Sequence, residues 1–201
     1  MRLVFVRESD LDHMGDVMTT AIFSDGRALT EEEFLAIGET PERIELFDGS
    51  LHVSPGPTPR HQRISLLLAT TLTPGANAAG LQVLEAVNLR VGTNRIPIPD
   101  LVMATDIDLD ELVVDASDVR FVCEITSPSN ASIDKVLKMH YYANAGIPWY
   151  LVVDTKSRTL RLHRLDGDIY VEEATCDAGQ ALRLTEPVDA TIDLGELLPA
   201  L

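Results

Sequence analysis

The sequence contains little cysteine: its 201 residues include only two, Cys123 and Cys176. Two cysteines so far apart form neither a disulfide framework nor a CxxC metal site, and this usage is typical of a reducing compartment. We therefore expect both thiols to be buried packing residues. We also expect a cytoplasmic location, because the first twenty residues contain no long apolar segment that leads to a small-residue cleavage site.

Positive charge is also scarce. Sixteen Lys and Arg residues stand against 32 Asp and Glu residues, which gives a formal net charge of −16 and a sequence pI near 4.5. This balance argues against a histone-like or polybasic protein and against binding to a membrane surface. Charged or polar residues also interrupt every apolar run before it reaches the roughly 18 to 20 residues that cross a bilayer.

Three common catalytic motifs are missing as well. The sequence has no G-x-x-x-x-G-K-[ST] phosphate loop, no G-x-G-x-x-G after a strand and no G-x-S-x-G. Nucleotide-loop proteins and serine hydrolases of the α/β type therefore lack support.

The length suits one domain with one sizeable hydrophobic core. No repeat, low-complexity tract or Pro/Ser-rich linker divides the chain. We expect residues 1–20 to form an N-terminal extension and residues 21–201 to form a single domain. The sequence from Met18 onward resembles the beginning of a protein. Residues 1–17 are therefore either a poorly ordered extension or the product of an upstream start codon, and both interpretations stay open.

Local patterns in the first quarter predict a short helix and a hairpin. Thr30 followed by three glutamates is typical of a capped helix start, and the helix should run to about Gly38. Residues 43–54 contain two short runs of near-alternating polarity separated by Asp48-Gly49, a strong signal for a tight turn. We therefore predict a β-hairpin over residues 43–54.

Helical and extended patterns then alternate. Apolar spacing predicts one helix from Thr58 or Pro59 to about Ala79, which should fray before Pro74-Gly75, and a second helix over 133–146. Strands are predicted over 83–92, 98–105, 120–126, 149–154, 159–165 and 169–175. This order predicts an α/β fold of the mixed α+β type, with a mixed central sheet flanked by helices.

The most informative chemistry lies at the ends of two predicted strands. Asp100 begins one strand and Glu124 lies near the end of the next, inside a run that otherwise favours burial. Two carboxylates at adjacent strand ends repel each other unless a hard divalent cation lies between them. Mg²⁺ would need only these two groups and the backbone carbonyl of Ile125. The alternative is that both carboxylates are solvated or ion-paired.

Several separated segments resemble a known family. They are IELFDGSLHVSPGPTPRHQRIS, IPIPDLVM and VCEITSPSNASIDKVLKMHYYANAGIPWYLVVD, and they resemble the Uma-two family of restriction endonuclease-like proteins in the PD-(D/E)XK nuclease superfamily. The resemblance runs from Thr30 to Leu165. It implies a restriction endonuclease-like core and an endonuclease that depends on Mg²⁺ or Mn²⁺, with Asp100 and Glu124 as catalytic metal ligands.

One departure concerns the catalytic lysine. The superfamily's lysine lies two residues after the acidic position, where this chain has Thr126. The resemblance implies that the lysine comes instead from the following helix, in a D-x-x-x-K-x-x-x-Y pattern. Asp134, Lys138 and Tyr142 have that spacing and share one helical stripe. We therefore prefer Lys138 over Lys135 as the cationic catalytic group.

Further residues match the family pattern, and each has a plainer interpretation. Glu45 is either a third acidic group near the metal or a strand residue paired with an arginine. His61 and Gln62 match the pattern at the start of the long helix. His61 either orients phosphate or transfers protons, or it is a polar helix-entry residue that only forms hydrogen bonds. Arg60 and Arg63 either contact phosphate or are solvated helix residues.

These observations lead to one hypothesis and one rival. We expect a Mg²⁺-dependent endonuclease that hydrolyses nucleic-acid phosphodiester bonds, with DNA as the substrate on the basis of the resemblance. The rival is a non-catalytic binding or assembly module that retains the nuclease fold, which the acidic charge favours. We also hypothesise a homodimer, because the strands at 159–165 and 169–175 are expected near a sheet edge that needs cover.

Overall fold

The computed structural model describes residues 3–6, 19–23, 27–38, 40, 42–54, 56–126 and 132–198. Its described helices are α1 (Glu31–Leu35), α2 (Pro59–Ala78), α3 (Ser132–Asn144) and α4 (Leu194–Leu197), with a 3-10 helix at Ala116–Asp118. None of the helices within these ranges is both long enough and apolar enough to cross a membrane.

The strands are named in chain order. They are β1 (Leu3–Val6), β2 (Thr19–Phe23), β3 (Arg43–Phe47), β4 (Ser50–Ser54), β5 (Gln82–Glu85), β6 (Asn88–Arg90), β7 (Leu101–Ala104), β8 (Val113–Asp115), β9 (Val119–Thr126), β10 (Trp149–Asp154), β11 (Thr159–Asp166), β12 (Ile169–Cys176), β13 (Ala181–Leu184) and β14 (Ala190–Asp193).

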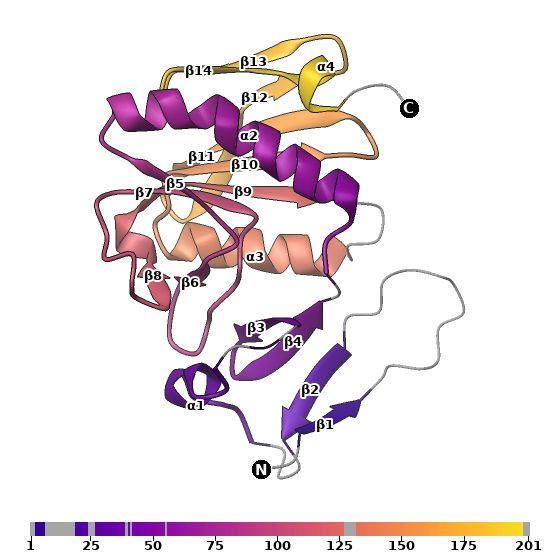
Figure 1. Cartoon of the computed structure of the whole chain (residues 1–201), viewed down its shortest axis with the longest axis vertical. Helices are drawn as coiled ribbons and strands as arrows, with labels where there is room; N and C mark the ends of the chain where they lie inside the picture. Colours follow the sequence, from indigo (N-terminus) through magenta and orange to yellow (C-terminus); the bar gives the residue numbers. More distant parts are fainter. Residues whose placement is uncertain are drawn as a thin grey trace.

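A six-stranded sheet forms the centre of the fold, in the order β12-β11-β10-β9-β7-β5. Strands β9 and β10 are parallel, and the other neighbouring strands pair antiparallel. Because parallel neighbours require a crossover, α3 connects β9 to β10. Helix α2 lies over one face of the sheet and α3 over the other (Figure 1). The predicted mixed α/β fold with a helix-flanked central sheet is confirmed.

Alternation along the central strands builds a core on each face of the sheet. Cys123 and Ile125 belong to the core on the α2 side, whereas Val122 belongs to the core on the α3 side. Strand β9 is buried along its length apart from Arg120, as expected for a strand covered on both faces. The same alternation directs Glu124 to the α3 side, where Lys138 and Tyr142 lie.

Helix α2 begins where the sequence predicts. The Thr58 hydroxyl accepts a hydrogen bond from the His61 N–H at 3.3 Å, and Pro59 occupies the first turn, where its missing N–H costs nothing. Thr58 therefore caps the helix at the end nearest the strand termini. This cap positions His61 in the first turn, close to Asp100 at the start of β7.

The predicted fraying of α2 before Pro74 is wrong, because the helix continues to Ala78. Proline inside a helix removes one hydrogen bond, which is why the sequence predicts a break there. Leu72 and Ala76 on either side of the proline are fully buried in the α2-side core. Tertiary packing of this face outweighs the local preference.

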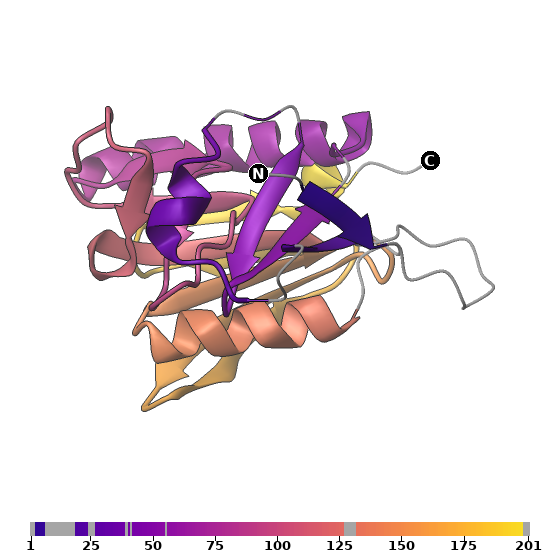
Figure 2. The ribbon, with the colours of Figure 1, turned by 90° about the horizontal axis from the view of Figure 1, so that it is seen from below.

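A second sheet, in the order β1-β2-β4-β3, lies at the other end of the molecule (Figure 1). Strands β3 and β4 form the predicted hairpin. Its turn residues Asp48 and Gly49 have φ values of 50° and 82°, as a type I′ turn requires. Helix α1 carries the predicted capping box at Thr30 and lies beside this hairpin (Figure 2).

A short segment before β7 joins the two sheets. Leu46 of β3 and Ile96 exchange backbone hydrogen bonds of 3.1 and 2.8 Å in an isolated bridge. Two residues further along, the Ile98 N–H donates to the carboxylate of Glu45 at 2.7 Å. The hairpin is thereby held against the strand end that carries Asp100.

One predicted strand is wrong in extent. Residues 83–92 form two short strands in different sheets, β5 in the central sheet and β6 paired with β8. The chain turns at Ala86, which has a φ of 52°, a conformation that alanine rarely adopts and that its identity does not signal. The predicted strands within 98–105, 120–126, 149–154, 159–165 and 169–175 are confirmed, with shifted ends.

The predicted boundary between an extension and a domain at residue 20 falls inside β2, which pairs with β4. Most of residues 1–18 lie outside the described residues. The separate extension and the origin of residues 1–17 therefore stay predictions.

The C-terminal half of α2 generates a prediction about Gly75. Alanine is favoured over glycine in a helix by about 1 kcal/mol, but a Cβ at Gly75 would lie 2.6 Å from the Asp189 carbonyl oxygen. Overpacking costs about 1 to 3 kcal/mol, so Gly75→Ala should lower the free energy of unfolding in urea titrations. Gly56→Ala, where no atom lies within 4 Å, is the control and should change it by less than about 0.5 kcal/mol. A more stable Gly75→Ala protein would contradict this account of the helix.

Candidate active site

The ends of β7 and β9 bring two carboxylates together, as the sequence predicts. Leu101 pairs with Cys123 in the antiparallel ladder, so the next residues outward, Asp100 and Glu124, lie opposite each other on one face of the sheet. Both residues are buried, with exposed fractions of 5% and 8%. The Ile125 N–H donates to Asp100 Oδ2 at 2.7 Å and ties the two strand ends together.

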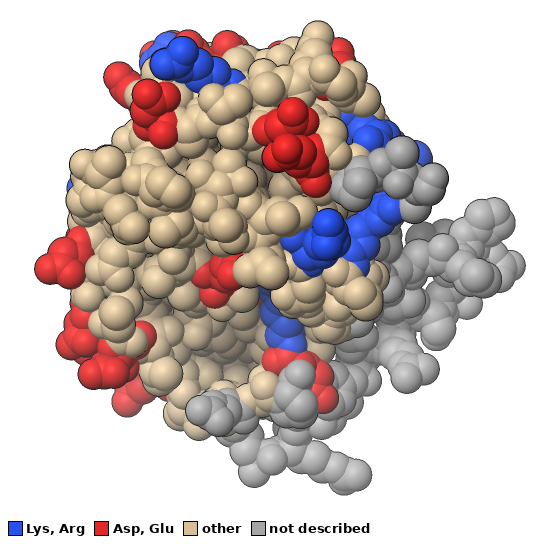
Figure 3. Space-filling view, turned by 45° about the horizontal axis from the view of Figure 1, so that its top comes forward, with Lys and Arg blue, Asp and Glu red and all other residues tan. Residues whose placement is uncertain are grey.

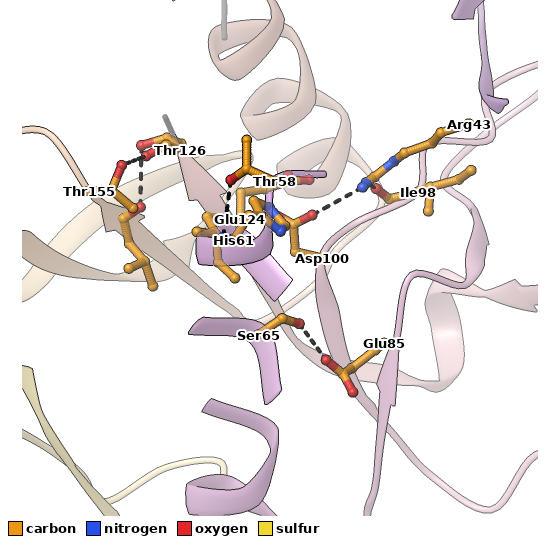
Figure 4. Close-up of polar contacts among 12 residues, drawn as sticks. Arg43, Thr58, His61, Ser65, Glu85, Ile98, Asp100, Glu124, Thr126 and Thr155 are labelled. Carbon is orange, nitrogen blue, oxygen red and sulfur yellow. Dashed lines mark hydrogen bonds and ion pairs between the residues drawn. The ribbon is translucent and has the colours of Figure 1, made fainter. Parts of the chain in front are cut away.

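Side chains from two other elements contact Asp100 (Figure 4). His61 Nε2 lies 3.2 Å from Asp100 Oδ2, and Arg43, the first residue of β3, donates to Asp100 Oδ1 at 3.2 Å. Burial alone would raise the pKa of Asp100. The hydrogen bond with His61, the positive charge of Arg43 and the Ile125 N–H outweigh burial and lower this pKa below its ordinary value. Asp100 is therefore ionised at neutral pH.

Glu124 lies in a different electrostatic environment. Its Oε1 accepts a hydrogen bond from the Tyr142 hydroxyl at 2.7 Å and lies 3.6 Å from Lys138 Nζ. Burial, helped by the negative charge of Asp100, outweighs these contacts and raises the pKa of Glu124 to about 7. This carboxyl therefore exchanges its proton near neutral pH.

Lys138 and Glu45 complete the buried cluster. Lys138 Nζ lies 2.8 Å from Glu45 Oε1, and the two side chains are only 6% and 3% exposed. Of the two interpretations of Glu45, the ion pair exists, but with this lysine rather than with an arginine. The structure thus places Lys138 between two acidic side chains of the cluster. The side chain of Lys135, on the same helix, lies outside what the structure describes.

The donor set of this cluster suits a hard divalent cation that keeps several water ligands. Within the described residues, Glu124 Oε2 has no hydrogen-bond partner, and Asp100 Oδ1 accepts only from Arg43. No group of three or more His, Cys, Asp or Glu side chains in that part of the chain is arranged to hold a metal. Two carboxylates are nevertheless the protein ligands that Mg²⁺ commonly uses, and water completes its shell.

The other residues predicted on α2 lie at the rim. The side chains of Gln62, Arg60 and Arg63 are exposed, and the Gln62 N–H donates to the Thr58 carbonyl oxygen as part of the helix start. Gln62 makes no side-chain contact with the cluster in the part of the chain described. Only His61 of this group reaches Asp100.

Thr126, two residues after Glu124, lies at the position where the sequence departs from the pattern that it resembles. Its side chain is buried, and its hydroxyl donates to the Val153 carbonyl oxygen at 3.3 Å, inside the sheet (Figure 4). The side chain of Asp134 and residues 127–131 lie outside the described residues. Of the predicted D-x-x-x-K-x-x-x-Y pattern, Lys138 and Tyr142 therefore contact Glu124, and the third position is untested.

Sequence reasoning missed one member of the site, Arg43. Its guanidinium contacts Asp100 and also donates to the Ile98 carbonyl oxygen. The negative charges of Glu45, Asp100 and Glu124 outweigh burial and raise its pKa. The sequence did contain an indication of this position. Arg43 and Glu45 are two residues apart in a predicted strand, so their side chains project from the same side.

The surface around the molecule is not uniformly acidic. On the face drawn in Figure 3, acidic and basic side chains both occur among uncharged ones, and basic side chains gather toward the right of the view. A net charge of −16 therefore does not exclude a local approach path for a polyanion.

The raised pKa of Glu124 predicts a pH dependence of stability in the metal-free protein. A carboxyl whose pKa is higher in the folded state stabilises that state fully below pH 4.5 and loses the contribution as pH rises to about 7. Urea titrations in EDTA should therefore show that wild type loses stability relative to Glu124→Gln across this window. The exposed Glu172→Gln variant should follow wild type. A constant difference between wild type and Glu124→Gln would contradict the electrostatic account.

Comparison with known proteins agrees with this architecture. The chain matches no curated protein. A crystal structure of a "putative nuclease belonging to DUF820" from Anabaena variabilis ATCC 29413 has the same fold, with a TM-score of 0.68 and 14% sequence identity. The similarity covers 84% of this chain and 97% of that one. Residues 31–195 match the family described as "Uma2: Putative restriction endonuclease", and this match shows that the chain belongs to the Uma2 family.

Proposed function

We propose that the protein is a divalent-metal-dependent endonuclease that hydrolyses phosphodiester bonds in nucleic acid. The observation that carries this proposal is the meeting of Asp100, Glu124 and Lys138 in one buried cluster at the ends of β7 and β9. Membership of the Uma2 family supports the same reaction class. A buried group of ionisable side chains with shifted pKa values is also typical of a functional site.

Asp100 and Glu124 would hold Mg²⁺ or Mn²⁺, with the backbone carbonyl of Ile125 as a further ligand. Such an ion, when bound, activates a water molecule and stabilises negative charge on the phosphate oxygens. The protein's contribution is to hold the two carboxylates at fixed positions. The Ile125 N–H fixes Asp100 Oδ2, and the Tyr142 hydroxyl fixes Glu124 Oε1.

Lys138 is the proposed cationic catalytic group. Glu45 holds its ammonium 2.8 Å away, and Glu124 Oε1 lies 3.6 Å from it on another side. An ammonium held there would position the attacking water and stabilise the charge that develops on the phosphate. His61, in contact with Asp100, is the proposed second group that orients phosphate or carries a proton.

The proposed substrate is DNA, since the family description refers to restriction endonucleases. Arg60 and Arg63 are exposed one helical turn apart on α2, next to His61, and would flank the path of the backbone. The cytoplasmic location expected from the cysteine usage would give access to that substrate.

We also propose that the protein forms a homodimer. Strand β12 lies at one edge of the central sheet, and Ile169 at its start is 61% exposed. Edge strands pair readily with other chains, and a twofold dimer would supply two cutting sites for one duplex. Light scattering should then give twice the 22.0 kDa chain mass at micromolar concentrations, whereas a constant single-chain mass would contradict the dimer.

Removing the charge of Asp100 tests the metal site. Asp100→Asn keeps the shape of the side chain but should abolish both the rise in melting temperature on adding Mn²⁺ and the cleavage of plasmid DNA. Wild type should gain about 2.7 kcal/mol of stability at a metal concentration one hundred times its Kd. Asp110→Asn, at an exposed carboxylate, is the control and should behave like wild type. DNA binding without cleavage by wild type in Mn²⁺ would favour the non-catalytic module instead.

Replacing Lys138 tests the catalytic cation. Lys138→Met should abolish cleavage and also destabilise the fold by about 3 to 5 kcal/mol, because it leaves buried carboxylates without their partner. Adding Glu45→Gln should recover much of the stability but none of the cleavage. Lys135→Met should retain both properties in the same melting and gel assays. Cleavage by the stable double variant would show that Lys138 is not needed.

A further inference from the structure

We infer that Arg43 is the residue of this site that binds a phosphate group of the substrate, an inference that rests on the proposed function. The buried cluster contains two cations from the described residues. The Lys138 side chain is 6% exposed and is engaged by two carboxylates, whereas the Arg43 side chain is 20% exposed. An anion that arrives from solution reaches the accessible cation first.

The donor geometry of Arg43 suits this role. A guanidinium has five N–H donors in one plane and matches two oxygens of a phosphate at once. One nitrogen of Arg43 donates to Asp100 Oδ1 at 3.2 Å, and another donates to the Ile98 carbonyl oxygen (Figure 4). In the part of the chain that the structure describes, these two bonds leave other donors of the same group to receive an anion. They also hold the guanidinium beside a proposed metal ligand.

Charge balance explains how the residue changes partner. Asp100, Glu124 and Glu45 contribute three negative charges when ionised, and Arg43 and Lys138 contribute two positive charges, so one negative charge is left. A divalent cation changes the balance to one positive charge. Asp100 then no longer depends on the guanidinium as its counter-ion, and a phosphate becomes the favourable partner of Arg43.

Arg43 comes from the second sheet, whereas the two proposed metal ligands come from the central sheet. Arg43 and Glu45 project from the same side of β3, which belongs to the second sheet. Glu45 reaches inward to Lys138, and Arg43 lies further out against Asp100. One strand thereby supplies both an internal support for the buried lysine and a group at the accessible side of the cluster.

Arg43→Gln, compared with Arg161→Gln, tests the inference. Arg161 is exposed on β11, so the control makes the same change in net charge away from the cluster. With Ca²⁺ present and a short fluorescein-labelled DNA duplex as the probe, Arg43→Gln should weaken binding about tenfold or more in anisotropy titrations. The slope of log K against log salt should fall by about one. Arg43→Lys should recover part of the affinity.

Mn²⁺ calorimetry on the same proteins separates phosphate binding from a structural role. Loss of a positive charge beside the carboxylates should leave the Mn²⁺ affinity of Arg43→Gln unchanged or tighter, whereas a structural residue would weaken metal and DNA binding together. Parallel loss of both would overturn the inference, as would equal DNA binding by the Arg43→Gln and Arg161→Gln variants or an absence of DNA binding by wild type.

The failure of the proposed function has a different signature. A wild type that binds the duplex in an Arg43-dependent way but neither binds Mn²⁺ nor cleaves would refute the endonuclease and support the phosphate-binding role. A wild type that binds Mn²⁺ and cleaves, with DNA affinity unaffected by Arg43→Gln, would support the endonuclease and refute the phosphate-binding role of Arg43.

Discussion

The burial of four charged groups beside the partly exposed Arg43, at one end of the central sheet, is the constraint on which the rest of the structure depends. Moving an ion out of water costs several kcal/mol unless partners and hydrogen bonds replace its solvation. Here every carboxylate of the cluster meets a cation, a hydroxyl or a backbone N–H. These partners come from β3, β9, α2 and α3, so the cluster exists only when elements from both sheets are assembled.

The second sheet contributes directly to the cluster, because its strand β3 carries two of the charged residues. Without β3 the cluster would lose Glu45 and Arg43, so Lys138 would keep only Glu124 as its charged partner among the described residues and Asp100 would lose its guanidinium contact. The isolated bridge between Leu46 and Ile96 holds the hairpin against the segment that leads into β7, so that Glu45 and Arg43 reach the cluster. The cluster is therefore complete only when the hairpin is in place.

Much of the fold was accessible from the sequence, because long periodic segments and strong turn signals act locally. The capped start of α1, the Asp48-Gly49 turn and the buried strand around Glu124 are examples. The break at Ala86 and the continuation of α2 past Pro74 were not, since the first needs an unusual backbone conformation and the second follows from tertiary packing. The added strands β8, β13 and β14 are short and carry weak patterns.

The site divides in the same way. The meeting of Asp100, Glu124 and Lys138 in one cluster was predicted from strand-end positions and from a family resemblance, since these residues lie on consecutive elements of one sheet and its crossover helix. Which charged group pairs with which could not be predicted from the sequence, because the pairing depends on how the two sheets pack against each other. Arg43 was missed for that reason, although it is only two residues from Glu45.

The segment between Pro97 and Pro99 has a consequence for how this site is dissected. Ile98 donates its N–H to Glu45 and accepts from Arg43 with its carbonyl oxygen. Both contributions come from the backbone, and its two proline neighbours have no N–H to offer in its place. An alanine scan would leave these bonds intact and would pass over Ile98. Its part in the cluster becomes visible when the backbone is altered, as when an ester replaces the Pro97–Ile98 amide and removes the N–H that donates to Glu45.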